Sequence, residues 1–91
     1  MKFLMLGKYS KEAIEKISSK RTEKALEIIK NSGGKIENMF ALLGSFDLAF
    51  IIDFPKIEDA IKTSVELSKL TGIGFTTFPA ITIEEFDKLV G

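Results

Sequence analysis

The chain has 91 residues, with 13 Lys and Arg balanced by 13 Asp and Glu, and it contains no Cys, His or Trp. The missing Cys and His exclude thiol nucleophiles, disulfides, zinc knuckles, Ser–His–Asp triads and imidazole metal cages, and we expect no cofactor or metal. A formal net charge of zero argues against a nucleic-acid partner, which calls for a clustered basic surplus. The length predicts a single domain over residues 1–91, and 45% hydrophobic residues suffice for a core.

The amino-terminal residues show no targeting or membrane segment. Their apolar run, Phe3–Leu6, is too short for the core of a signal peptide and far too short to cross a bilayer. We therefore expect a cytoplasmic protein with no membrane partner.

The first third of the chain predicts a strand and a helical region. A short apolar run indicates a buried strand at Lys2–Leu6. Ser10 is a suitable cap for a helical region over residues 11–30, where apolar residues recur at helical spacing. That spacing lapses at Ser18–Arg21, where we expect Ser19 to cap a second helical piece.

The rest of the chain predicts three more strands and two helices. Glycines at Gly33–Gly34 end the first helical region, and Gly72 ends the next one. Thr82 and Glu85 form a capping box, which predicts a short carboxyl-terminal helix from Ile83. The remaining elements are the strands Lys35–Leu43, Asp47–Phe54 and Ile73–Ile81 and the helix Lys56–Leu70.

This β-α-β-β-α-β order predicts an α+β fold, a ferredoxin-like sandwich with a four-stranded antiparallel sheet and the first and third strands central. One face of the hairpin suits a helix-covered core: Met39, Ala41, Leu43, Leu48, Phe50 and Ile52. The other face carries Phe40, Leu42, Ala49 and Ile51, which nothing else in the chain covers. We expect a second copy to cover it, giving a homodimer or a higher homo-oligomer with sheet against sheet.

The segment Gly44–Asp47, followed by an apolar strand that ends in Asp53, resembles the Gly-x-Tyr-Asp signature of the GYD domain family. Tyr9–Ser10, Arg21, the Gly33–Gly34 turn and Ala80 ahead of Glu84–Phe86 fit the same pattern, so the resemblance covers about Phe3 to Leu89. It implies a dimeric α+β barrel in which two ferredoxin-like sheets face each other and enclose a cavity, and it implies no substrate.

The sequence departs from the family pattern at two informative positions. Phe46 stands in place of the signature Tyr and removes a phenol that proton chemistry would need. Lys20 stands in place of a frequent Pro, which would let the two helical pieces merge.

Two carboxylates lie on the uncovered face of the hairpin. Asp47 and Asp53 are six residues apart, about 20 Å along a strand, so they cannot form a dyad within one chain. Burial between two sheets would raise their pKa values and suit acid or base catalysis. In the alternative interpretation, Asp47 caps the Gly44–Phe46 turn, and Asp53 caps a strand end or helix start or pairs with a Lys.

A polar cluster is predicted at one mouth of the space between the sheets. We expect the first strand to run parallel to the third, which brings Tyr9 close to Asp53 and Asn38. The plainer alternative is a half-exposed Tyr and a solvated Asn. Arg21, the only arginine, either contacts an anionic ligand or ties a helix to a carboxylate.

These observations predict a small homodimeric barrel that binds a small, mostly apolar ligand between its sheets. Phe40, Leu42 and Ile51 would line the site, and Asp53, Asn38 and Tyr9 would orient a polar end of the ligand. The alternative is a cofactor-independent enzyme acting on an activated carbonyl or aromatic compound with Asp53 as base. If the cavity admits no ligand, the domain is an assembly unit only, and an amino-acid-binding regulatory module shares this element order.

Overall fold

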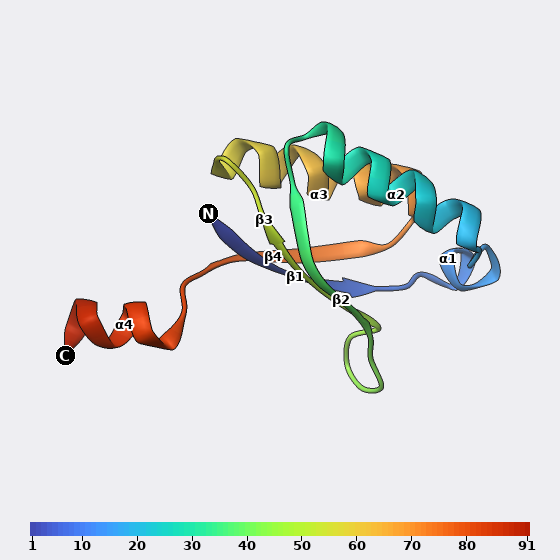
Figure 1. Cartoon of the computed structure of the whole chain (residues 1–91). Helices are drawn as coiled ribbons and strands as arrows, with labels where there is room; N and C mark the ends of the chain where they lie inside the picture. The colour runs from blue at the N-terminus through green and yellow to red at the C-terminus, as the bar shows by residue number, and fades with distance from the viewer.

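The chain folds into one antiparallel sheet, with helices packed against one of its faces and a carboxyl-terminal helix beyond its end (Figure 1). The computed structural model describes all residues, 1–91. Its elements are β1 (Lys2–Lys8), α1 (Lys11–Glu15), α2 (Ser19–Asn31), β2 (Lys35–Ala41), β3 (Leu48–Asp53), α3 (Ile57–Thr71), β4 (Gly74–Ala80) and α4 (Ile83–Val90). The strand order β2-β3-β1-β4 confirms the ferredoxin-like prediction with the first and third strands central.

Strand direction differs from the prediction at the centre of the sheet. β1 pairs antiparallel with β3, with Lys2 opposite Asp53 and Gly7 opposite Leu48. The parallel arrangement that we expected is wrong, because the β2–β3 hairpin reverses the chain and places β3 between two strands that run the same way. The end of β1 therefore lies at the hairpin loop, at the opposite end of β3 from Asp53.

The first helical region remains in two pieces. The hydroxyl of Ser10 accepts a hydrogen bond from the Ala13 amide at 3.0 Å and begins α1, as predicted. Ser18, and not Ser19, caps α2 by accepting from the Arg21 amide at 3.0 Å. Because Ser18 is in an extended conformation (φ −159°, ψ 154°), the two pieces do not merge.

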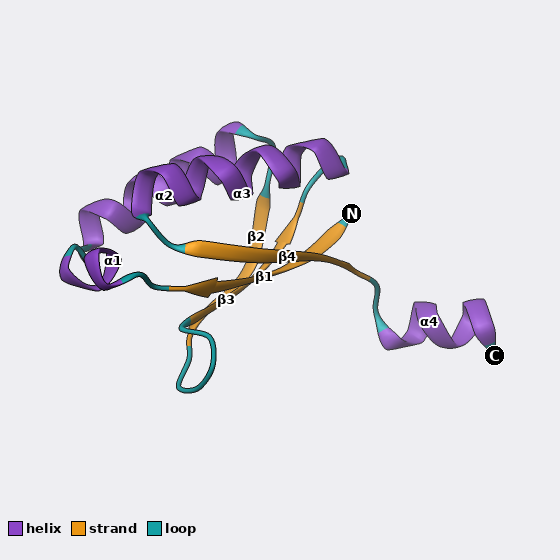
Figure 2. Cartoon of the chain, turned by 180° about the vertical axis from the view of Figure 1, so that it is seen from behind, coloured by secondary structure: helices purple, strands orange, loops and turns teal.

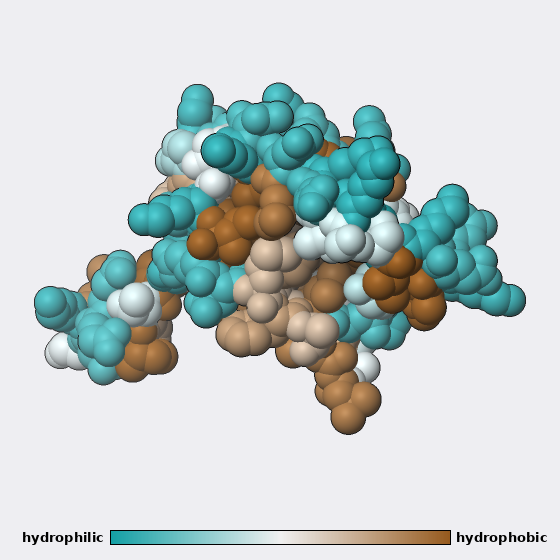
Figure 3. Space-filling view, turned by 45° about the vertical axis from the view of Figure 1, so that its right-hand side comes forward, coloured by the Kyte–Doolittle hydropathy of each residue, from teal (hydrophilic) through white to brown (hydrophobic).

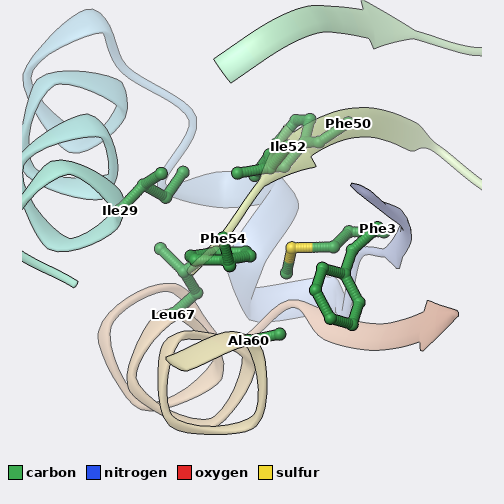
Figure 4. Packing of buried hydrophobic residues seen from close by; sticks show 8 residues of the cluster. Phe3, Ile29, Phe50, Ile52, Phe54, Ala60 and Leu67 are labelled. Atoms are coloured by element: carbon green, nitrogen blue, oxygen red, sulfur yellow. The ribbon is translucent and has the colours of Figure 1, made fainter. Parts of the chain in front are cut away.

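The core lies between the helices and the covered face of the sheet. Ile29 of α2 and Leu67 of α3 reach toward the sheet residues in Figure 4. Phe3 and Phe54 meet edge to face, with ring centroids 5.8 Å apart. The residues of this cluster are all 5% exposed or less: Phe3, Met5, Ile29, Phe50, Ile52, Phe54, Ala60 and Leu67. Gly34 is needed at the start of β2, because a Cβ there would lie 2.7 Å from the Phe54 ring.

The carboxyl-terminal helix α4 begins as predicted and then leaves the body of the domain. Thr82 accepts a hydrogen bond from the Glu85 amide at 3.1 Å, which confirms the capping box. In Figures 1 and 2, α4 projects beyond the end of the sheet as an arm. Its apolar side chains stay exposed, including Phe86 at 48% and Leu89 at 75%. None of the helices is both long enough and apolar enough to cross a membrane.

Candidate functional site

The face of the sheet that the helices leave uncovered is largely apolar. We call it the open face and define it by two rows of paired residues. One row is Asn38, Ile51, Leu4 and Phe78, and the other is Phe40, Ala49, Leu6 and Thr76. Phe40 is 52% exposed and Phe78 is 45% exposed. In Figure 3, hydrophilic atoms cover the helical layer while hydrophobic atoms gather over the strands below it.

Charged side chains lie at the two ends of the open face. At one end Lys2 pairs with Glu37, and the Met1 ammonium contacts the Asp53 carboxylate at 2.9 Å. At the other end the Lys8 ammonium donates to the Ser45 carbonyl at 3.0 Å. An apolar centre with polar ends is the arrangement that protein interfaces adopt.

The predicted cluster of Tyr9, Asn38 and Asp53 does not form. Asn38 lies midway along the edge strand β2, where it pairs with Ile51. Asp53 lies at one end of β3, and Tyr9 follows β1 at the other end. The cause is the antiparallel pairing of β1 with β3, which carries the end of β1 away from Asp53.

Asp53 is not a buried acid or base in this structure. Its side chain is 49% exposed, and a hydrogen bond from the Met1 ammonium lowers its carboxyl pKa below the ordinary 3.8. The charge of that ammonium and the positive charges of Lys2 and Lys35 lower the pKa further. In the single chain the carboxyl pKa of Asp53 is therefore lowered and not raised, and a carboxylate of this kind is a weak general base. Its predicted lysine partner is replaced by the ammonium of Met1.

The model of the GYD domain family matches residues 3–90, nearly the whole chain. The chain belongs to the GYD family. No curated protein gives a significant match. Family membership thus agrees with the α+β fold and supplies no substrate.

In this GYD domain, the last residue of the signature segment fastens the hairpin to β1. The Asp47 carboxylate accepts a hydrogen bond from the Tyr9 amide at 2.8 Å, and the Asp47 amide donates to the Gly7 carbonyl at 2.8 Å. The predicted cap on the preceding turn is wrong, because the carboxylate reaches the end of β1 instead. Gly44 adopts φ +143°, a conformation that side-chain-bearing residues rarely take. The signature is therefore explained by structure at these two positions.

A cavity of about 240 Å³ lies on the other side of the sheet, between the helices and the strands. It is found where β1 ends, α2 begins and α3 ends. Ten of its 13 lining residues are hydrophobic, among them Ala25, Met39, Phe50 and Leu67. No local pattern in the sequence predicts this cavity, because it depends on how side chains from α2, α3 and the sheet fill a shared space.

Arg21 is the only charged residue that lines this cavity. One of its guanidinium nitrogens, Nη1, donates to the Ala13 carbonyl at 2.7 Å, and its Cζ lies 5.8 Å from the centroid of the Tyr9 ring. The predicted tie to a carboxylate is wrong, since the three ion pairs of the chain do not include Arg21. The one signal in the sequence for this position is that Arg21 is the only arginine of the chain.

Proposed function

We propose that this GYD domain is a homodimer in which the open faces of two copies pack against each other and hold a small, mostly apolar molecule between them. The observation that carries the proposal is the pattern of the open face: two rows that are apolar except for Asn38 and Thr76, with charged side chains at the ends of the face. An exposed apolar patch with polar residues at its margin is often a functional interaction surface. A second copy offers the same apolar centre, which makes the surface self-complementary.

The size of the surface supports a second copy when α4 is included. Four strands at 4.8 Å spacing and about seven residues of strand length give a projected area of roughly 400 Å². A stable dimer needs about 800 Å² of accessible surface from each partner, so the sheet supplies a large part of it. The apolar side of α4 supplies more, because Ile83, Phe86 and Val90 lie on one side of that helix. In a face-to-face dimer, α4 would pack on the partner.

Within this dimer, the proposed ligand position is the centre of the open face. Phe40 and Ile51 would contact its apolar body, with Leu42 beside them, and Asn38 would give the nearest hydrogen-bonding group. Asp53 would lie at one end of the space. Tyr9 is not part of this position, because it follows the end of β1 beside the hairpin loop, away from the centre of the open face.

Light scattering coupled to size-exclusion chromatography tests the dimer with a matched pair of variants. Phe78→Lys places a charge on the open face at an edge strand, whereas Ile61→Lys places one on α3, where Ile61 is 58% exposed. We expect the unmodified chain and Ile61→Lys to be dimers and Phe78→Lys to be a folded monomer, because an unpaired buried charge is costly. A dimer that survives Phe78→Lys and dissociates with Ile61→Lys would show that another surface joins the copies.

Neutral aromatic probes test the ligand position separately. Naphthalene and indole, followed by thermal shift and native mass spectrometry, should bind the dimeric Ile61→Lys variant and not the monomeric Phe78→Lys variant. Equal binding to both variants would remove the ligand from between the sheets and leave the dimer intact.

A further inference from the structure

The cavity between the helices and the sheet has a mostly apolar lining and one cationic side chain, Arg21, that forms no ion pair. We propose that it is a binding site for a small carboxylate with an apolar body, such as a short aromatic or aliphatic acid, whose carboxylate pairs with Arg21. The site lies between the helices and the covered face of the sheet, and Phe40 of the edge strand β2 is the one residue of the open-face rows that also lines it. It is therefore complete within a single copy and does not require the proposed homodimer.

The lining of the cavity determines the body of the ligand. Ala25 of α2, Leu67 of α3 and the sheet residues Met39, Phe50 and Phe75 surround it with hydrocarbon and aromatic surface. A lining of this kind favours an apolar ligand body, because contact with these side chains removes its apolar surface from water. The volume of about 240 Å³ is below the roughly 300 to 1,000 Å³ of sites for drug-sized molecules, so the ligand is small.

The charge at the cavity determines the ligand's polar end. Of the guanidinium donors of Arg21, one is engaged by the Ala13 carbonyl, and no acidic side chain of the chain pairs with the rest. The bond to Ala13 and the Tyr9 ring hold the guanidinium in place, which lowers the entropic cost of using its remaining donors. A guanidinium presents paired N–H groups that fit a carboxylate bidentately.

The remaining lining residues favour a carboxylate over a phosphate. No lysine or second arginine lines the cavity, so a doubly charged phosphate would be left with a net negative charge beside apolar surface. A monoanionic carboxylate is balanced by Arg21 alone. Tyr9 also lines the cavity and carries a hydroxyl that can donate a hydrogen bond to the carboxylate, whereas the Thr22 hydroxyl already donates to the Ser18 carbonyl at 3.2 Å.

Isothermal titration calorimetry with paired probes tests the site. The acids are benzoate, phenylacetate and hexanoate, and each is compared with its neutral amide. We expect at least one acid to bind the unmodified chain about tenfold or more tightly than its amide, which is the range for a charge-assisted hydrogen-bonded pair. Binding of that acid should raise the melting temperature of the protein, because the ligand binds the folded state.

Three variants separate the charge from the cavity. Arg21→Gln should weaken acid binding about tenfold or more and leave amide binding unchanged, whereas Lys20→Gln, one residue away and outside the cavity lining, should change neither. Ala25→Leu fills the cavity and should abolish binding of both probes. Circular dichroism establishes that each variant is folded.

Two results would overturn the proposal. One is the absence of saturable binding by all three acids at millimolar concentration. The other is acid binding that persists in Ala25→Leu or that falls equally with Lys20→Gln and Arg21→Gln, since the anion would then be held by general surface charge.

Discussion

The two faces of this sheet are built from alternate residues of the same strands, and they have very different surroundings. On the covered face, Phe3, Met5 and Ile52 are 1% exposed or less beneath α2 and α3. On the open face, Phe40 and Phe78 are about half exposed, at 52% and 45%. Both faces are apolar, so hydrophobicity alone does not tell which one the chain's own helices cover. The difference shows that β1 and β3 carry two apolar surfaces, of which the helices of the chain cover only one.

The largest predicted effect comes from comparing one phenylalanine on each face. Phe3→Ala removes a fully buried ring that packs against Phe54, and it should lower the free energy of unfolding by about 3–5 kcal/mol. Phe78→Ala should lower the free energy of unfolding of the isolated chain by about 1 kcal/mol or less, since about half of this residue is already in water. Urea denaturation at low protein concentration measures both.

The same pair of variants examines the second packing surface. With increasing protein concentration, the loss of stability from Phe78→Ala should grow, because dimerisation stabilises the folded state by mass action. The loss of stability from Phe3→Ala, measured against the unmodified chain, should be the same at every protein concentration. Equal and concentration-independent losses for the two variants would break the distinction between the faces.

A smaller effect is expected from α4, which would extend the second surface beyond the sheet. Phe86→Asp places a charge on the apolar side of α4 and should weaken the dimer about tenfold to a hundredfold. Lys88→Ala, on the other side of the helix, should have little effect. Because α4 projects from the body, neither change should alter the unfolding of the monomer. A stability loss of several kcal/mol for the Phe86→Asp monomer would show that α4 packs on its own chain, since losses of about 3–5 kcal/mol mark buried side chains.

The smallest effect concerns the charged end of the open face. The Met1 ammonium lowers the Asp53 pKa, so this pair contributes stability that is present above about pH 4 and is lost as the pH falls through the lowered pKa. Asp53→Asn should therefore show a shallower loss of stability in acid than the unmodified chain. The exposed Asp87→Asn serves as the control in a series of urea titrations between neutral and acidic pH. Identical acid profiles for Asp53→Asn and the unmodified chain would contradict this role of the pair.

Much of the fold follows from local sequence patterns, whereas the candidate site depends on the direction of the strands and on how side chains pack. Apolar residues on both sides of the strand Leu48–Asp53 identified the open face, and Thr82 identified the start of α4, because both signals involve residues close together in the chain. The position of Tyr9 relative to Asp53 depended on strand direction, and one wrong choice separated the predicted cluster. The cavity beside Arg21 joins residues from α2, α3 and the sheet, and no local pattern specifies the space left between their side chains.

The central claim is that a second copy of the chain covers the open face, and the mass of the unmodified protein in solution tests it most directly. Sedimentation equilibrium over a range of micromolar concentrations should give a mass of twice the 10.1 kDa of one chain. A single species of 10.1 kDa throughout that range would contradict the claim.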